Sequence, residues 1–375
     1  MEAFNPGALG ILLVTGVPAL PALRAALLPC AHALATTLSP AARARLEDPA
    51  SSYQMGWSHG REAVAAGGRP DTAKASFYAN PLVERPGSGE DERTVRAYPG
   101  LARPCVWPVG GHGDAAEDGL ARALPPAFRA AGSAMAAVGR AVAAAADALL
   151  AARGCPASPS LVGALGEGKG AKGRLLYYFP PPGTGGGGEP APGVSGDDDD
   201  DGWCGWHVDH SLLTVLCPAV YLHAVTGGEV RCPDARAGLW VRPRRRGGGA
   251  AAGAGAAARA GGTAPIQIAI PAGALAVQFG EAAQALAGGA LEATPHCVRA
   301  PAPAPPSAPP TARASFALFL QPWVDVPLTP PAGRAGVAAV GVPRWRPGDT
   351  FGAFSERTVA AYWGERRGGD GDGEG

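Results

Sequence analysis

Residues 203–222 read WCGWHVDHSLLTVLCPAVYL, and their pattern decides the fold class. From Leu212 to Leu222 the stretch is apolar and bounded, which is typical of buried strands. Comparable short runs recur beyond residue 160, separated by Gly, Pro and Asp clusters: 175–179, 239–242, 266–270, 274–279 and 316–320. Many short strands without intervening helices predict a sandwich or barrel of the jelly-roll type.

The N-terminal part of the chain contains the helical signals. Leucines at mixed three- and four-residue spacing predict a helix over residues 23–34, and an Ala-rich stretch predicts a longer one over 125–153, stopped by Gly154. A buried strand is predicted at 9–17, and residues 48–116 are predicted to be mostly loop. The chain is therefore predicted to be an α+β protein with a double-stranded β-helix (jelly-roll) core and flanking N-terminal helices.

The change from helical patterns to short strand-like runs near residue 160 predicts a division of the chain into regions. Residues 1–160 are expected to form an N-terminal helical and loop region, 161–328 the jelly-roll domain, and 329–375 a C-terminal tail packed on the core. Low-complexity insertions interrupt the second region, and they contain too few apolar side chains to offset the entropy of ordering them. We expect solvated surface loops at these insertions, which span 181–202, 243–264 and 300–312.

The charge balance makes some classes of partner improbable. Lys and Arg together number 32, as do Asp and Glu, so no general attraction to nucleic acid or to anionic membranes is expected. The apolar runs near the N-terminus are shorter than the ~20 residues that a membrane span requires. Glu2 and the lack of a basic N-terminal region argue against a secretory signal. We expect a cytoplasmic monomer with no nucleic-acid or membrane partner, and import into an organelle stays open.

The cysteines predict neither a disulfide framework nor a structural zinc site. There are 7 of them, scattered along the chain and without a Cys-x-x-Cys pair. Reduced thiols in an intracellular compartment are the expected state.

A metal site is predicted from His207 and Asp209. If both lie on one strand, residues i and i+2 face the same side and offer an imidazole nitrogen and a carboxylate oxygen together. His296 can supply a third ligand from a neighbouring strand. Two imidazoles and one carboxylate on one face of an octahedral ion leave three positions open, which is the arrangement of non-haem Fe(II) oxygenases.

A second pair of candidate site residues, suited to bind a carboxylate, follows later in the sequence. Arg313 and Ser315 precede the apolar run 316–320, so on a strand their side chains face the same way. A guanidinium donates two parallel hydrogen bonds to a carboxylate, and a hydroxyl adds another. This pair therefore predicts a binding site for a carboxylate such as the distal one of 2-oxoglutarate.

Three segments resemble the catalytic core of the 2-oxoglutarate/Fe(II)-dependent dioxygenases, in particular the isopenicillin N synthase-like group common in plants and algae. They are WCGWHVDHSLLTVL (203–216), GALAVQFGEAAQALAGGALEATPHCVRA (273–300) and RASFALFLQPWVD (313–325). In that group, His-x-Asp and a later His bind iron, and Arg-x-Ser binds 2-oxoglutarate.

The resemblance implies the following roles for the matching residues. His207, Asp209 and His296 would be the catalytic metal ligands, and Arg313 and Ser315 would bind 2-oxoglutarate. It also implies Fe(II) as cofactor, 2-oxoglutarate and O2 as co-substrates, and hydroxylation or another oxidation of a small-molecule substrate with release of succinate and CO2.

The sequence departs from the family in two respects. The family's Asn-Tyr-Tyr-Pro segment binds the co-substrate through the Tyr before Pro, where this chain has Phe179. Either Tyr178, which we include in the predicted site, or Tyr177 replaces it, or that contact is absent. The insertion after His296 also makes Arg299 a rival to Arg313, which is preferred because it opens a strand and precedes Ser315.

Alternative functions remain open at this point. An oxidase on the same scaffold would not use 2-oxoglutarate, and the missing Tyr hydroxyl favours it weakly. A non-catalytic jelly-roll binding protein is a further alternative, but a decayed site is expected to have lost at least one of the five polar residues.

Overall fold

The apolar runs of the sequence form the strands of two antiparallel sheets. The computed structural model describes residues 2–4, 8–61, 70–181, 202–243, 264–302, 310–334 and 336–363. The larger sheet has the order β1-β11-β6-β13-β4-β3-β2, with β7 and β8 joined to it through β13, and the smaller sheet has the order β10-β9-β12-β5. The strands are β1 (Ile11–Thr15), β2 (Gly56–His59), β3 (Lys74–Ala79), β4 (Lys172–Tyr178), β5 (Gly202–His207), β6 (Leu213–Leu216), β7 (Val220–His223), β8 (Glu229–Val230), β9 (Gly238–Val241), β10 (Ile266–Gln267), β11 (Ala274–Phe279), β12 (His296–Arg299) and β13 (Thr311–Leu320).

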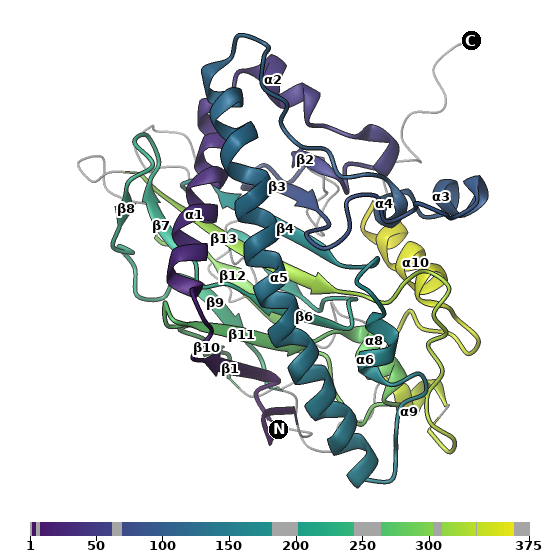
Figure 1. Cartoon of the computed structure of the whole chain (residues 1–375). Helices are drawn as coiled ribbons and strands as arrows, with labels where there is room; N and C mark the ends of the chain where they lie inside the picture. The colour runs from purple at the N-terminus through teal and green to yellow at the C-terminus, as the bar shows by residue number, and fades with distance from the viewer. Residues whose placement is uncertain are drawn as a thin grey trace, which may run out of the picture.

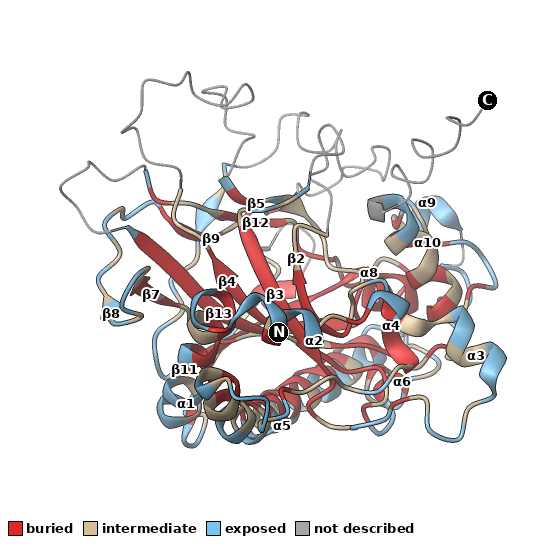
Figure 2. Ribbon diagram, turned by 90° about the horizontal axis from the view of Figure 1, so that it is seen from above, coloured by how far each residue is buried: buried red, intermediate tan, exposed pale blue. Residues whose placement is uncertain are grey.

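Helices cover one face of the larger sheet, and the smaller sheet lies over the other (Figures 1 and 2). The α+β jelly-roll fold predicted from the sequence is thereby confirmed. The helices and helical turns are η1 (Glu2–Phe4), α1 (Leu20–His32), η2 (Ala33–Thr37), α2 (Pro40–Arg45), η3 (Pro49–Ser51), α3 (Glu92–Ala97), α4 (Pro99–Ala102), α5 (Ala115–Ala152), α6 (Leu161–Leu165), α8 (Glu281–Leu286), α9 (Val337–Val340) and α10 (Phe351–Trp363).

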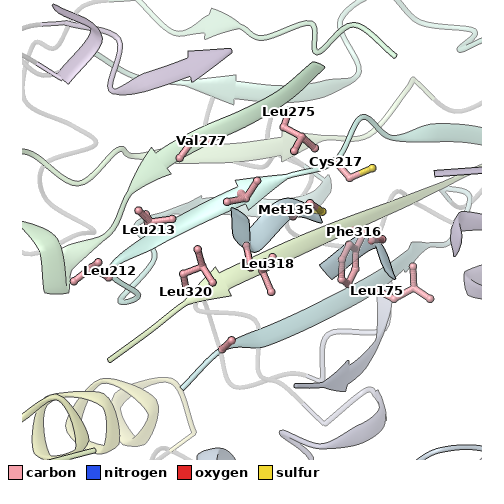
Figure 3. Close-up of a cluster of buried hydrophobic side chains, with 14 of the residues drawn as sticks. Met135, Leu175, Leu212, Leu213, Cys217, Leu275, Val277, Phe316, Leu318 and Leu320 are labelled. Atoms are coloured by element: carbon pink, nitrogen blue, oxygen red, sulfur yellow. The ribbon is translucent and has the colours of Figure 1, made fainter. Parts of the chain in front are cut away.

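Strand alternation divides the larger sheet into an apolar outer face and a mixed inner face. On β13, Phe316, Leu318 and Leu320 point outward and join the main core with Met135 of α5, as Figure 3 shows. Ala317, between them, belongs to a separate cluster that lies between the two sheets. The helices pack on the outer face of the sheet, and the polar side chains of its strands lie on the inner face.

Helix α5 begins ten positions earlier than the sequence predicted, at Ala115 instead of Pro125. The carboxylate of Asp114 accepts hydrogen bonds from the backbone of Ala116 and Glu117, so it caps the helix start. At Gly139 the helix lies so close to the sheet that an added Cβ would stand 2.3 Å from Leu320. Among the described helices, α5 alone has the length and composition of a membrane span, and its apolar side packs on the sheet as that of a core helix does.

Loops and turns make up most of the described part of residues 48–116, as predicted, but the prediction missed the strands and helices that lie between them. This region contributes β2 and β3 to the larger sheet and also contains α3 and α4. Lys74 and Ser76 of β3 are polar but buried, because they lie on the inner face. A strand whose inner face is polar lacks the apolar signal on which the prediction relied.

The larger sheet takes strands from both sides of residue 160. β1 pairs with β11, and β3 pairs with β4. The division into the regions 1–160, 161–328 and 329–375 stays a prediction. So does the surface position of the insertions 181–202 and 243–264, which lie almost wholly outside the described residues. The third predicted loop, 300–312, is partly wrong, because its last two residues, Thr311 and Ala312, are buried at the start of β13. All seven cysteines are free thiols, as expected.

Candidate metal centre

Two neighbouring strands of the smaller sheet bring the two histidines together. β12 pairs with β5, and His296 stands directly opposite His207 in the register. Their ring centroids are 4.2 Å apart. His296 is buried, whereas His207 is half-buried, so one side of this pair is accessible from outside.

Asp209 reaches the histidines from a loop and not, as predicted, from the strand that carries His207. β5 ends at His207, and the chain turns so that the backbone carbonyl of Asp209 accepts a hydrogen bond from the amide of Glu281 over 2.8 Å. Gly280 permits this approach, because an added Cβ would lie 2.7 Å from that carbonyl oxygen and 2.2 Å from the carbonyl oxygen of Ser211.

The carboxylate of Asp209 lies close to the Nε2 atoms of both imidazoles. Its Oδ1 is 3.7 Å from Nε2 of His207, and its Oδ2 is 3.8 Å from Nε2 of His296. These separations are too long for good hydrogen bonds. One donor atom from each of the three residues lies within 4.8 Å of the others, which makes them a group that can hold one metal ion.

Backbone carbonyls fix the orientation of both rings. Nδ1 of His207 is 2.8 Å from the oxygen of Gly205, and Nδ1 of His296 is 3.0 Å from the oxygen of Thr294. When each Nδ1–H donates to its carbonyl, each Nε2 keeps a lone pair directed toward Asp209. Metal-binding histidines are oriented in this way.

Two inner-face side chains of the larger sheet hold the Asp209 carboxylate. Thr214 Oγ1 donates to Oδ2 over 2.6 Å, and Gln278 Nε2 donates to the same oxygen over 3.0 Å. The Gln278 amide nitrogen also lies 3.2 Å from Nε2 of His296. Sequence reasoning missed both residues, although Gln278 carried a signal as the one polar residue of the buried strand ALAVQF.

The ionisation states of Asp209 and His296 suit a cation, whereas His207 would have to lose a proton. Burial by itself raises the pKa of Asp209, but the imidazoles of His296 and His207 and the bonds from Thr214 and Gln278 bring it below its ordinary value. Burial, assisted by His207, lowers the pKa of His296 to about 4, so that ring is neutral at pH 7. Burial acts to lower the pKa of His207 as well, but the opposite effect of the neighbouring Cys204 and Asp209 is larger. The pKa of His207 is therefore raised, to about 9. A metal ion would displace that proton.

Arg313 and Ser315 lie together on the inner face of β13, and both are buried. Nη1 of Arg313 donates to the Ser315 hydroxyl over 3.4 Å, and Nε has no hydrogen-bond partner. Within the part of the chain that the structure describes, no carboxylate lies within 4.0 Å of this guanidinium. A buried arginine without an anion is suited to bind one.

Arg299, the alternative arginine, occupies a different surface. By strand alternation, Arg299 faces the side of β12 opposite to His296 and Val298. Its guanidinium stacks 4.2 Å from the centre of the Trp240 ring. Val298, by contrast, packs between the two sheets. The geometry therefore favours Arg313 over Arg299 for a carboxylate near the metal centre.

The two tyrosines of β4 face opposite ways. Tyr178 pairs with Arg313 in the register, and the Arg313 guanidinium lies 5.0 Å from the centre of its ring. Tyr177 belongs to the outer core, where its ring lies 5.8 Å from that of His32 of α1. Tyr178 is therefore the tyrosine on the same side of the sheet as Arg313.

His210 follows Asp209 in the loop after β5 and packs against α10. Its Nε2 is 3.3 Å from the hydroxyl of Ser355, and its ring stacks on Phe351 at 6.2 Å. Burial lowers its pKa to about 4.

Solved structures with the same architecture identify the fold. JOX2 in complex with 2OG, Fe and JA matches 96% of this chain and 79% of its own, with a TM-score of 0.58 and 16% identity. The fold is that of the 2-oxoglutarate/Fe(II) oxygenases. A full-length Neurospora crassa protein in complex with alpha-KG matches 95% of this chain and 87% of its own, with a TM-score of 0.53 and 15% identity.

A 2OG-Fe(II) oxygenase family protein from Caulobacter crescentus is similar in the same way. It matches 93% of this chain and 89% of its own, with a TM-score of 0.52 and 17% identity. No protein-family model matches the chain, and no curated protein matches it by sequence. At these identities the likeness concerns the fold.

Proposed function

We propose that this protein is an Fe(II)- and 2-oxoglutarate-dependent dioxygenase that oxidises a small-molecule substrate, with release of succinate and CO2. The observation that carries the proposal is the convergence of His207, Asp209 and His296, whose donor atoms lie within 4.8 Å of one another. Two imidazoles and one carboxylate are the donor set of the non-haem Fe(II) oxygenases. The fold supports the same conclusion.

In this proposal the protein provides the ligands and the environment of the metal. His207, Asp209 and His296 would hold Fe(II), which supplies the redox chemistry with O2 and 2-oxoglutarate. The hydrogen bonds from Thr214 and Gln278 would hold the Asp209 carboxylate toward the ion, and they add to the effect of the two imidazoles in lowering its pKa. The backbone carbonyls of Gly205 and Thr294 keep the rings in the matching orientation.

The co-substrate would be bound by Arg313, Ser315 and Tyr178. The unpartnered Nε of the buried Arg313 supports this assignment, because a carboxylate would satisfy both its charge and its hydrogen-bonding capacity. The same observation favours a 2-oxoglutarate-dependent enzyme over an oxidase that needs no co-substrate.

A small-molecule substrate is supported by two observations. The formal net charge is zero, which gives no general attraction to nucleic acid. The similar structures of JOX2 and of the Neurospora crassa protein hold JA and thymine, respectively. A cytoplasmic, monomeric enzyme without a membrane partner remains our expectation.

Release of succinate tests the proposal. Purified protein with Fe(II), 2-oxoglutarate and O2 should form succinate slowly even without a substrate, and His207→Ala should lose both iron and succinate formation. If succinate never forms, and His207→Ala binds as much iron as the unaltered protein, the proposal is wrong.

A spectroscopic experiment separates the two kinds of oxygenase. Under nitrogen, addition of 2-oxoglutarate to the Fe(II)-loaded protein should produce a visible charge-transfer band. A protein that binds Fe(II) but develops no such band would instead be an oxidase that does not use 2-oxoglutarate.

A further inference from the structure

Arg313 has a tyrosine on the neighbouring strand on each side. β13 pairs with β4 along one edge and with β7 along the other, and Arg313 stands opposite Tyr178 of β4 and opposite Tyr221 of β7. Residues that stand opposite each other in an antiparallel pair share a face of the sheet. Tyr221 therefore lies with Arg313 and Tyr178 on the inner face, and it packs against the cluster between the two sheets.

A tryptophan of the smaller sheet lies against both tyrosines. The ring centre of Trp203 on β5 is 5.2 Å from that of Tyr178 and 6.5 Å from that of Tyr221. Its Nε1 donates to the backbone oxygen of Phe179 over 2.8 Å, which fixes the position of the indole. Trp203 and Tyr178 are buried, whereas Tyr221 is half-buried. Of these three rings, Tyr221 is thus the one nearest to solvent.

The hydroxyl of Tyr221 interacts with Arg313. Burial raises the pKa of Tyr221 to about 12, while the charge of Arg313 and a hydrogen bond with it act in the opposite direction. An arginine can only donate, so the hydroxyl oxygen accepts this bond and its proton is left for another acceptor. That acceptor is the sulfur of Cys232, whose thiol donates to the backbone oxygen of Asp234 over 3.0 Å. A thiol is a weak acceptor, and a carboxylate is a much stronger one.

The guanidinium of Arg313 has donors for the same carboxylate. Its Nε is buried and has no hydrogen-bond partner, and the bond from Nη1 to the Ser315 hydroxyl is long, at 3.4 Å. A carboxylate at this position would satisfy the buried charge. It would also lie within reach of a second hydroxyl, that of Tyr221.

β5 links this position to the metal centre. Cys204 follows Trp203 on the strand and packs against the same cluster between the sheets. Its Sγ lies 3.8 Å from Nδ1 of His207. One side chain therefore separates a proposed metal ligand from the aromatic residues around Arg313. A carboxylate at Arg313 would be the far end of a ligand whose other end reaches the ion.

We propose that Tyr221 binds the co-substrate, its hydroxyl oxygen accepting from Arg313 and its proton donated to the distal carboxylate of 2-oxoglutarate. This assignment rests on the proposed function, which identifies the ligand as 2-oxoglutarate. The strands on both sides of β13 then contribute to the co-substrate site. Tyr221 would help to distinguish 2-oxoglutarate from a 2-oxo acid that has no distal carboxylate.

Two 2-oxo acids test this proposal on the complete protein loaded with Fe(II) under nitrogen, with binding measured by calorimetry. 2-Oxoglutarate and 2-oxopentanoate have the same carbon chain and differ in the distal carboxylate. We expect Tyr221→Phe to weaken binding of 2-oxoglutarate by ~10-fold, the cost of one hydrogen bond to a charged group, and to leave binding of 2-oxopentanoate unchanged. The substitution keeps the ring, so the packing against Trp203 is retained.

Tyr53→Phe is the matched control. Tyr53 also lies beside an arginine, with its ring centre 4.4 Å from the guanidinium of Arg61, but it precedes β2 at the edge of the larger sheet. This variant should bind both acids as the unaltered protein does. Unchanged binding of 2-oxopentanoate by Tyr221→Phe would also show that the variant is folded.

Two results would overturn the proposal. One is that Tyr221→Phe binds 2-oxoglutarate as tightly as Tyr53→Phe does, and the other is that it binds both acids equally weakly, as loss of packing alone would cause. Succinate formation by the unaltered protein reports separately on the proposed function. Succinate with full affinity of Tyr221→Phe for 2-oxoglutarate contradicts only the role of Tyr221, whereas a selective loss of affinity without succinate contradicts only the dioxygenase.

Discussion

The side-chain amide of Gln278 on β11 donates a hydrogen bond to Oδ2 of Asp209 over 3.0 Å, and the same nitrogen lies 3.2 Å from Nε2 of His296. A single residue of the larger sheet thus contacts two of the proposed metal ligands, one from a loop and one from the smaller sheet. This contact couples the two sheets at the metal centre.

We expect Gln278→Leu to weaken metal binding by ~10- to 100-fold, as is usual when a group that orients metal ligands is removed. The substitution leaves Asp209 with the hydroxyl of Thr214 as its remaining side-chain hydrogen-bond donor. Equilibrium dialysis against Fe(II) under nitrogen measures the effect. Gln267→Leu, at an exposed position of β10, is the control. Equal affinities for the two variants would show that Gln278 does not orient the ligands.

Arg313→Leu should raise the KM for 2-oxoglutarate by at least ~100-fold, because two charge-assisted hydrogen bonds are lost. Arg313→Lys should be intermediate, since an ammonium cannot form the paired bonds of a guanidinium. The comparison with Arg299→Leu is decisive for the choice between the two arginines. If Arg299→Leu has the larger effect, the co-substrate lies elsewhere.

Tyr178→Phe should raise the KM for 2-oxoglutarate by ~5- to 10-fold, the cost of one hydrogen bond, if its hydroxyl replaces the one that Phe179 lacks. Tyr177→Phe should have no effect on KM, because that ring packs on the outer side of the sheet. Steady-state kinetics of the two variants answer the question. Identical kinetics for both would mean that no tyrosine of β4 binds the co-substrate.

Lys172→Met should stabilise the protein at pH 7. The folded-state pKa of about 7 lies below the ordinary value of 10.5, so the folded protein resists protonation that the unfolded chain accepts. The resulting destabilisation, on the order of a few kcal/mol, is complete below pH 7 and disappears as the pH rises to 10.5. The difference in Tm between variant and unaltered protein should shrink over this range. A difference that grows with pH would contradict the assigned pKa shift.

Residue spacing together with the resemblance to a known family selected the three proposed ligands, but the reasoning about their geometry was partly wrong. His207 and His296 do come from neighbouring strands. Asp209, in contrast, lies in a loop, because β5 ends at His207 and the chain is held there by Glu281. Alternation along a strand could not reveal a turn that depends on a contact with residues 72 positions away.

Polar residues on the inner face were the main source of error elsewhere. Ser76 and Lys74 made β3 look like a loop, and Thr214 and Gln278 were not singled out within otherwise apolar strands. Each is buried because it faces the space between the sheets. That environment is defined by the pairing of distant strands, which a local pattern does not contain.

The central claim is that two imidazoles and one carboxylate bind a single ion, and anaerobic titration with Fe(II) tests it most directly. We predict one ion per chain for the unaltered protein and loss of that binding in each of His207→Ala, Asp209→Ala and His296→Ala, with His210→Ala retaining it. If His296→Ala binds Fe(II) as tightly as the unaltered protein, the three residues do not form one metal centre.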